Sequence, residues 1–235
     1  MNLITAVTFL RKNILDDVGG LDADWASFSS DDTDTLQLRW TNEEIVSNIN
    51  EAMNQVYRRI LPVKDSSNTF DISAVPGTSD YTLDPRILRI KGVRDTTTNK
   101  SLKQLDLEDV WENDHLFTEQ KTPECYIVNY DSGSITFYKT PSENVVYSLL
   151  VYRLPLETLS WDDNYCDIEL REEFIVPMLW YAAALCYEKD EANILDPERV
   201  AYFTGKFNRE FTTTSAYSDT RKRRTARRST RYGGL

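Results

Sequence analysis

The spacing of apolar residues changes twice along this chain, and that change limits the fold more than any other feature. Apolar residues recur every three or four positions near the N-terminus, from Leu3 to about Asp16 and again from Thr41 to Ile60. From Thr69 to Leu154 they alternate with polar residues, which is the period of a strand. Helical spacing returns at Glu169. The pattern predicts helices at both ends of the chain, with β-structure inserted between them.

The helical segments carry start and stop signals. Thr41 and Glu44 have the spacing of a capping box, so the second helix should begin there and end before Pro62. Asp196-Pro197 places an N-cap and a proline at the first position of a last helix, in which Phe203, Phe207 and Phe211 follow helical spacing. The fold class we expect is α+β: a helical bundle of about four main helices with an inserted antiparallel β-meander.

The alternating segments give the expected strands. Three lie in 69–73, 80–84 and 87–95, and three more in 124–130, 134–138 and 144–154. A tight turn at Asp131-Ser132-Gly133 joins two of the later strands, with Gly133 at positive φ. A short helix is expected over 105–113. These spans predict a single domain over 1–212, with helical parts 1–62 and 167–212, a β-rich insertion 66–158 and a C-terminal tail 213–235.

The segment 169–190 is apolar on most sides. Such a helix is buried in its own domain or at a subunit interface. Pro177 should kink it or mark its effective start. The residues expected in this core or interface role are Phe174, Met178, Trp180, Tyr181 and Leu185.

The C-terminal stretch is strongly basic. It carries seven cations and no acid from Arg221 onward, namely Arg221, Lys222, Arg223, Arg224, Arg227, Arg228 and Arg231. The whole chain has 27 Lys and Arg against 38 Asp and Glu, so without these seven the body holds 20 cations and a net charge of −18. A segment with so little apolar surface should be disordered when free. We expect it to dock on a partner, with Tyr232 as an anchor.

Two kinds of partner fit a basic tail. Nucleic acid would bind seven cations in a salt-dependent way. A body of net −18 repels a polyanion, however, and the strand pattern shows no aromatic-plus-basic surface of the RNA-binding type. A protein partner is therefore the favoured interpretation, and a nucleic-acid-binding module remains an alternative.

No constellation for catalysis assembles in the sequence. His115 is the only histidine, and the three cysteines are unclustered, so neither a metal nor a cofactor site is expected. The paired carboxylates at 162–163 and 172–173 are better explained by solvated faces than by acid–base chemistry. We expect no enzyme. The longest apolar run is too short to span a bilayer and no signal-peptide pattern opens the chain, which favours synthesis in the cytoplasm without a membrane partner.

Three segments resemble a known family. They are the hairpin YDSGSITFYKTPSE (130–143), the strand VYSLLVYRLPLE (146–157) and the helical pair from Asp167 to Phe207. Together with the order of helices and the basic tail, they are similar to the head-to-tail adaptors of tailed bacteriophages, also called connector or head-completion proteins.

The resemblance implies a structural role in a virion neck, with assembly in the host cytoplasm. Such adaptors form rings, usually dodecameric, beneath the capsid portal and above the tail, and genomic DNA passes through their channel. Helix 169–190 would then serve both core and subunit interface, acidic residues would line the lumen, and the tail would enter acidic clefts on the portal. A tail-tube or nozzle component of the same particle is the structural alternative.

Overall fold

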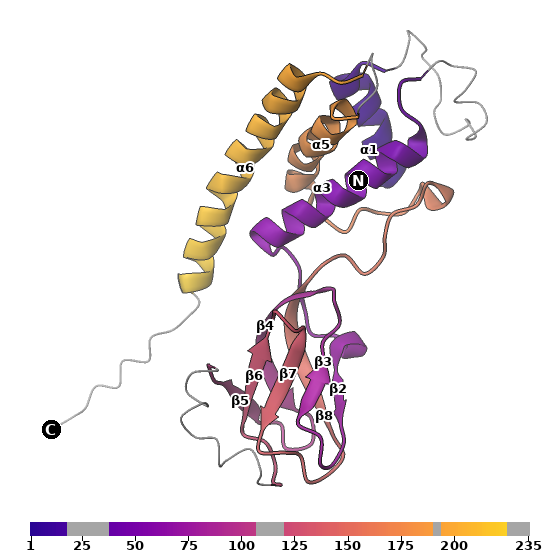
Figure 1. Ribbon diagram of the computed structural model, residues 1–235. Helices are drawn as coiled ribbons and strands as arrows, with labels where there is room; N and C mark the ends of the chain where they lie inside the picture. Colours follow the sequence, from indigo (N-terminus) through magenta and orange to yellow (C-terminus); the bar gives the residue numbers. More distant parts are fainter. Residues whose placement is uncertain (18–37, 107–119, 190–193, 225–235) are drawn as a thin grey trace, which may run out of the picture. The chain divides into compact units, whose positions relative to one another are not determined.

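The chain forms two compact units in a computed structural model that describes residues 1–17, 38–106, 120–189 and 194–224 (Figure 1). Met1–Ile60 and Glu157–Leu235 make the helical unit, and Leu61–Leu156 make the sheet unit. The two ends of the chain therefore fold together, and the central segment has a core of its own.

The N-terminal helix has two parts. α1 (Leu3–Phe9) begins at Asn2, whose Oδ1 accepts a hydrogen bond of 3.1 Å from the amide of Thr5. It continues as η1 (Leu10–Leu15), a π-helix that ends where Asp16 takes a left-handed backbone with φ 53°. The predicted helix over 3–16 is confirmed, with a wider second half.

α3 (Asn42–Ile60) confirms the predicted capping box. The Thr41 amide donates to Glu44 Oε2 at 2.9 Å, and the Glu44 amide donates to Thr41 Oγ1 at 3.1 Å. Each side chain satisfies an amide that lacks a partner within the helix. Leu61, at φ 48°, leaves the helical conformation directly after it.

α5 (Glu172–Tyr187) and α6 (Pro197–Arg224) complete the helical unit. Pro177 lies inside α5, where it removes one backbone hydrogen bond. The predicted N-cap of α6 is confirmed, because Asp196 Oδ1 accepts from the amides of Glu198 and Arg199, both at 3.1 Å. α6 runs twelve residues beyond Thr212, into the segment 213–235 that the sequence analysis assigns to the C-terminal tail.

The described residues of the sheet unit form eight strands and a short 3-10 turn, η3 (Asn68–Phe70). A second such turn, η5 (Trp161–Asp163), lies in the helical unit. The strands are β1 (Lys64–Asp65), β2 (Ile72–Ala74), β3 (Asp80–Thr82), β4 (Ile87–Asp95), β5 (Ser101–Gln104), β6 (Cys125–Asn129), β7 (Ser134–Tyr138) and β8 (Val145–Arg153). Their order in the sheet is β1-β8-β4-β5-β6-β7-β3, and β2 also pairs with β8.

This sheet overturns the expected fold class of a helical bundle with an inserted meander. It is a large mixed sheet, because β5 and β6 are parallel while the other pairs are antiparallel. The last strand of the series, β8, lies between β1 and β4, and β3 pairs with β7, so these strands are not next to their sequence neighbours as they would be in a meander. Alternation along a strand shows which face is buried and not which strand pairs with it. The short helix expected over 105–113 falls, from residue 107 onward, outside the described residues.

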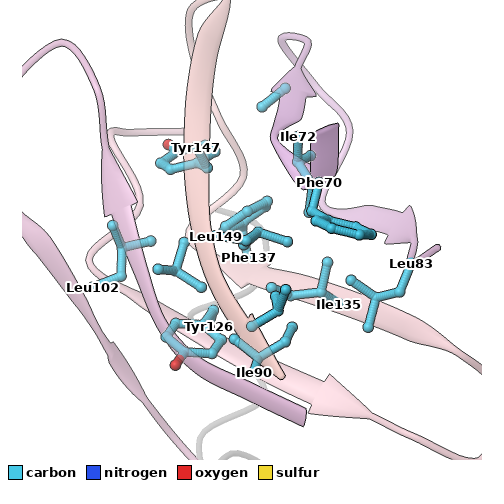
Figure 2. Close-up of a cluster of buried hydrophobic side chains, with 13 residues drawn as sticks. Phe70, Ile72, Leu83, Ile90, Leu102, Tyr126, Ile135, Phe137, Tyr147 and Leu149 are labelled. Atoms are coloured by element: carbon cyan, nitrogen blue, oxygen red, sulfur yellow. The ribbon is translucent and has the colours of Figure 1, made fainter. Parts of the chain in front are cut away.

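The sheet curls around its own apolar core (Figure 2). Phe137 stacks on Tyr147 with ring centroids 4.3 Å apart, and Tyr81 meets Phe137 edge-on at 5.6 Å. Burial raises the pKa of Tyr126 and of Tyr147 to about 12, so both phenols stay neutral. Gly133 has the predicted positive φ, at 62°.

Candidate functional site

Aromatic rings fasten α6 to α5 along three consecutive turns. Tyr187 stacks on Phe203 with centroids 6.1 Å apart, and Tyr181 stacks on Phe207 at 4.8 Å. Phe174 and Phe211 form the third pair at 6.0 Å. The three phenylalanines of α6 are four residues apart, which places them on one side of the helix. We call these pairs the aromatic ladder. It fixes the course of α6, the helix that leads into the cationic tail.

The five α5 residues predicted for the core or subunit interface fall into two groups. Met178 is fully buried, whereas Phe174, Trp180, Tyr181 and Leu185 are half-buried. The Trp180 ring lies 5.2 Å from the Lys206 ammonium, a cation–π contact within the helical unit. The other buried positions of α5 are not among these five residues, and they are Ile175, Pro177, Leu179, Ala182, Ala183, Ala184, Cys186 and Tyr187. The interface role remains a prediction.

The predicted docking residues lie at or beyond the end of α6. The backbone of Arg221–Arg224 forms its last four residues. Arg227, Arg228, Arg231 and Tyr232 lie outside the described residues. The first four residues of the cationic stretch are therefore helical, and the docking role of the stretch remains a prediction.

A buried ion pair joins the end of η1 to the residues before α3. Arg11 Nη1 lies 2.5 Å from Asp17 Oδ2, and its Nη2 donates to Trp40 O at 2.7 Å and to Asn42 Oδ1 at 2.9 Å. Asp17 Oδ1 also accepts from the Arg39 amide at 3.0 Å. Burial lowers the pKa of Arg11 and raises the pKa of Asp17, because both charges have left water. We call this group the Arg11 clamp. No pattern in the sequence pointed to this group.

The clamp continues into α5 through Trp40. The indole Nε1 donates to the carbonyl of Cys186 at 2.8 Å, and the ring meets Tyr187 edge-on with centroids 5.3 Å apart. Tyr187 of the aromatic ladder is thus in direct contact with Trp40 of the Arg11 clamp. These contacts link the N-terminal helix, the start of α3 and α5 within the helical unit.

The cysteine thiols are protonated at neutral pH. Burial raises the pKa of Cys186 to about 12, and burial also raises the pKa values of Cys125 and Cys166. No group of His, Cys, Asp and Glu suited to a metal ion occurs within 1–17, 38–106, 120–189 and 194–224. His115 falls outside these ranges.

An open pocket of about 460 Å³ lies between the end of η1 and the start of α6. Two of its polar side chains, Asp196 and Arg199, are engaged with neighbours. Arg199 pairs with Asp196 at 3.3 Å, hydrogen-bonds the Tyr187 hydroxyl and stacks its guanidinium over that ring at 4.9 Å. Arg199 thereby holds the start of α6 against Tyr187 of α5.

A comparison with family models decides the class of protein. The model described as SU10 adaptor protein matches residues 10–231. The chain belongs to the SU10 adaptor protein family. This is a family of phage head-to-tail adaptors, so the resemblance seen in the sequence is confirmed. No curated protein matches the chain.

The match spans both units of the adaptor and reaches Arg231 in the cationic tail. Membership places the adaptor among the structural proteins of the virion neck and implies contact with portal and tail components. Across the described parts of the adaptor, no helix is long and apolar enough to cross a membrane.

Proposed function

We propose that this adaptor forms a homo-oligomeric ring that joins the capsid portal to the tail and lines the channel for genomic DNA. The observation that carries the proposal is the family match over 10–231, which includes the helices, the sheet and most of the basic tail. Twelve copies are the expected number, and a tail-tube or nozzle protein is the expected partner below the ring.

Two features support the division of roles within this ring. Helix α5 has half-buried aromatic side chains, such as Trp180 and Tyr181, that a neighbouring copy can cover. The body without its basic tail has a net charge of −18, so carboxylates lining the channel would repel DNA and let it slide. The cationic tail, with Tyr232 as anchor, would dock on acidic clefts of the portal.

Portal docking is tested by shortening the tail. A chain ending at Thr220 loses all seven cations and Tyr232. We expect it to keep the melting behaviour of the full chain, because the aromatic ladder ends at Phe211, and to lose binding to the cognate portal ring in a pull-down. A matched control replaces only Gly233 and Gly234 by serine and should bind normally. Undiminished binding by the shortened chain would refute the docking role.

The same variants separate protein docking from nucleic-acid binding. If the tail bound DNA as its main partner, the logarithm of the affinity would fall with the logarithm of salt with a slope of about −6 for seven phosphate contacts. Fluorescence anisotropy with duplex DNA measures this slope. A slope of that size for the full chain, lost on shortening, would favour the nucleic-acid alternative over the portal.

A further inference from the structure

The outer face of the sheet unit is basic, although the chain as a whole is acidic. On β8 the side chains of Tyr147, Leu149 and Val151 are buried in the core, so the alternate positions face outward. Three cations pair with those outward positions. Lys64 and Arg89 both oppose Tyr152 from the two sides of β8, and Arg94 opposes Ser148.

Two more lysines extend this surface. Leu102 of β5 is buried opposite Val93, so the next residue, Lys103, has its side chain on the outer face. Lys91 is exposed at the irregularity of β4 between Ile90 and Gly92. We call Lys64, Arg89, Lys91, Arg94 and Lys103 the basic sheet face. Tyr152 lies between Lys64 and Arg89 on this face, an arrangement that only the strand register reveals.

None of these five cations makes an ion pair or side-chain hydrogen bond with the part of the chain that the structure describes. Other cations of the same unit do have carboxylate partners. Arg86 lies 2.7 Å from Asp84, and Arg153 lies 2.5 Å from Asp65. Asp71 accepts from the backbone amide of Leu149 at 3.3 Å. The positive charges of the basic sheet face are therefore available to bind a partner.

Gly92 leaves the middle of this face without a side chain, so another chain can approach the backbone there. It opposes Leu150, and a Cβ placed on it would meet no atom within 4 Å. Its φ is not in the left-handed region, so neither packing nor backbone conformation requires glycine here. Glycine inside a strand weakens it and often marks the close approach of another chain. Val146, 40% exposed, adds apolar surface on the same face.

A surface of opposite character lies on the helical unit. The segment 162–173 contains six carboxylates and one cation, Arg171. It is fixed to α1 by backbone hydrogen bonds, from Leu3 N to Cys166 O at 2.9 Å and from Ile4 N to Asn164 O at 2.8 Å. Tyr165, 66% exposed, projects from it. We call this segment the acidic turn. Exposed aromatic side chains are enriched at protein–protein contacts, and complementary charges around them orient the partner.

We propose that the basic sheet face of one copy binds the acidic turn of a second copy. The two surfaces differ, so the contact is heterologous, and such contacts generate rings when the rotation closes. A protein occupant is favoured over a nucleic acid because the face has one half-buried aromatic ring, Tyr152, where strand-binding sheets present several for stacking. The inference rests on the proposed ring and names the surfaces that hold it together.

Charge reversal tests the contact. Arg89→Glu/Arg94→Glu and Asp162→Lys/Asp163→Lys should each raise the concentration at which rings form by about tenfold or more, since each places like charges together. A chain carrying all four substitutions regains opposite charges at every contact and should assemble as the unchanged chain does. The control Lys12→Glu/Arg58→Glu changes net charge equally at exposed cations of the helical unit and should leave assembly unchanged. Mass photometry reports assembly, and circular dichroism melting confirms folding.

A second variant avoids any change of charge. Gly92→Tyr fills the low centre of the face and should also impair assembly, without lowering the melting temperature. Normal rings from Arg89→Glu/Arg94→Glu would overturn the inference and leave the proposed ring intact. An unchanged chain that forms no ring, alone or with portal, would overturn both. Unimpaired assembly together with lost binding to a fluorescent DNA duplex would assign the face to nucleic acid instead and refute the contact.

Discussion

Replacing Phe207 by alanine removes the middle pair of the aromatic ladder between α5 and α6. The side chain is fully buried and stacks on Tyr181 at 4.8 Å. It also lies 4.7 Å from the Phe211 ring, and the Arg59 guanidinium stands 4.6 Å above it. The substitution therefore opens a cavity at the point where α6 is held to the rest of the helical unit.

The expected cost follows from these contacts. A buried Phe→Ala change costs about 3–5 kcal/mol, and the lost aromatic and cation–π contacts place Phe207 towards the upper end of that range. At about 2–4 °C per kcal/mol for a unit of this size, Tm of the helical unit should fall by about 10 °C or more. Circular dichroism at 222 nm follows this transition.

Two matched variants test the reasoning. Phe207→Leu keeps most of the buried volume and should cost about 1–2 kcal/mol. Tyr202→Ala removes a ring that is 57% exposed on the same helix and should shift Tm by less than 3 °C. If Phe207→Ala melted within 3 °C of the unchanged chain, the aromatic ladder would not be what holds α6 in place.

Three further predictions concern stability. Arg11→Leu leaves the buried Asp17 carboxylate without its ion-pair partner, and it should lower the free energy of unfolding in urea by about 3–5 kcal/mol. The double change Arg11→Leu/Asp17→Leu should cost less than the single change, and a larger cost for the pair would contradict this. Hydrogen bonds from Arg86 lower the pKa of Asp84. Desolvation tends to raise the pKa of Asp95, but hydrogen bonds from Thr98 and Thr97 outweigh this effect, and the pKa of Asp95 is lowered as well. Because both folded-state pKa values lie below the unfolded ones, their stabilisation is present above the unfolded value and lost as the pH falls below about 4, and Asp84→Asn/Asp95→Asn should flatten this loss in acid titration of the sheet unit. Gly77→Ala, at φ 82°, should cost about 1–3 kcal/mol and Gly92→Ala less than about 0.5 kcal/mol in the same assay, an order that would be reversed if Gly92 were the strained position.

Local features of the helical ends could be predicted from sequence because their causes are local. The Thr41–Glu44 capping box and the Asp196 N-cap each depend on residues three positions apart or fewer, and both form as expected. The apolar period likewise predicted which phenylalanines of α6 face the core. The family, too, could be recognised from short segments and was confirmed.

The strand pairing could not be predicted in this way. Strands β1 and β5 have two and four residues, too few for an alternating pattern to stand out. The parallel pair β5–β6 and the central place of β8 depend on contacts between residues far apart in the chain. The expected meander was therefore wrong even where six of its strands were found.

Charge shows the same division between local and long-range causes. The sequence alone determined that the chain is acidic with a basic end, because net charge is a property of composition. Only the tertiary structure decided that Lys64, Arg89 and Arg94 share one face beside Gly92, since their strands, β1 and β4, pair with the two sides of β8. It also decided that Arg11 is buried on Asp17, a pairing that forms only when the chain closes around both charges and excludes water.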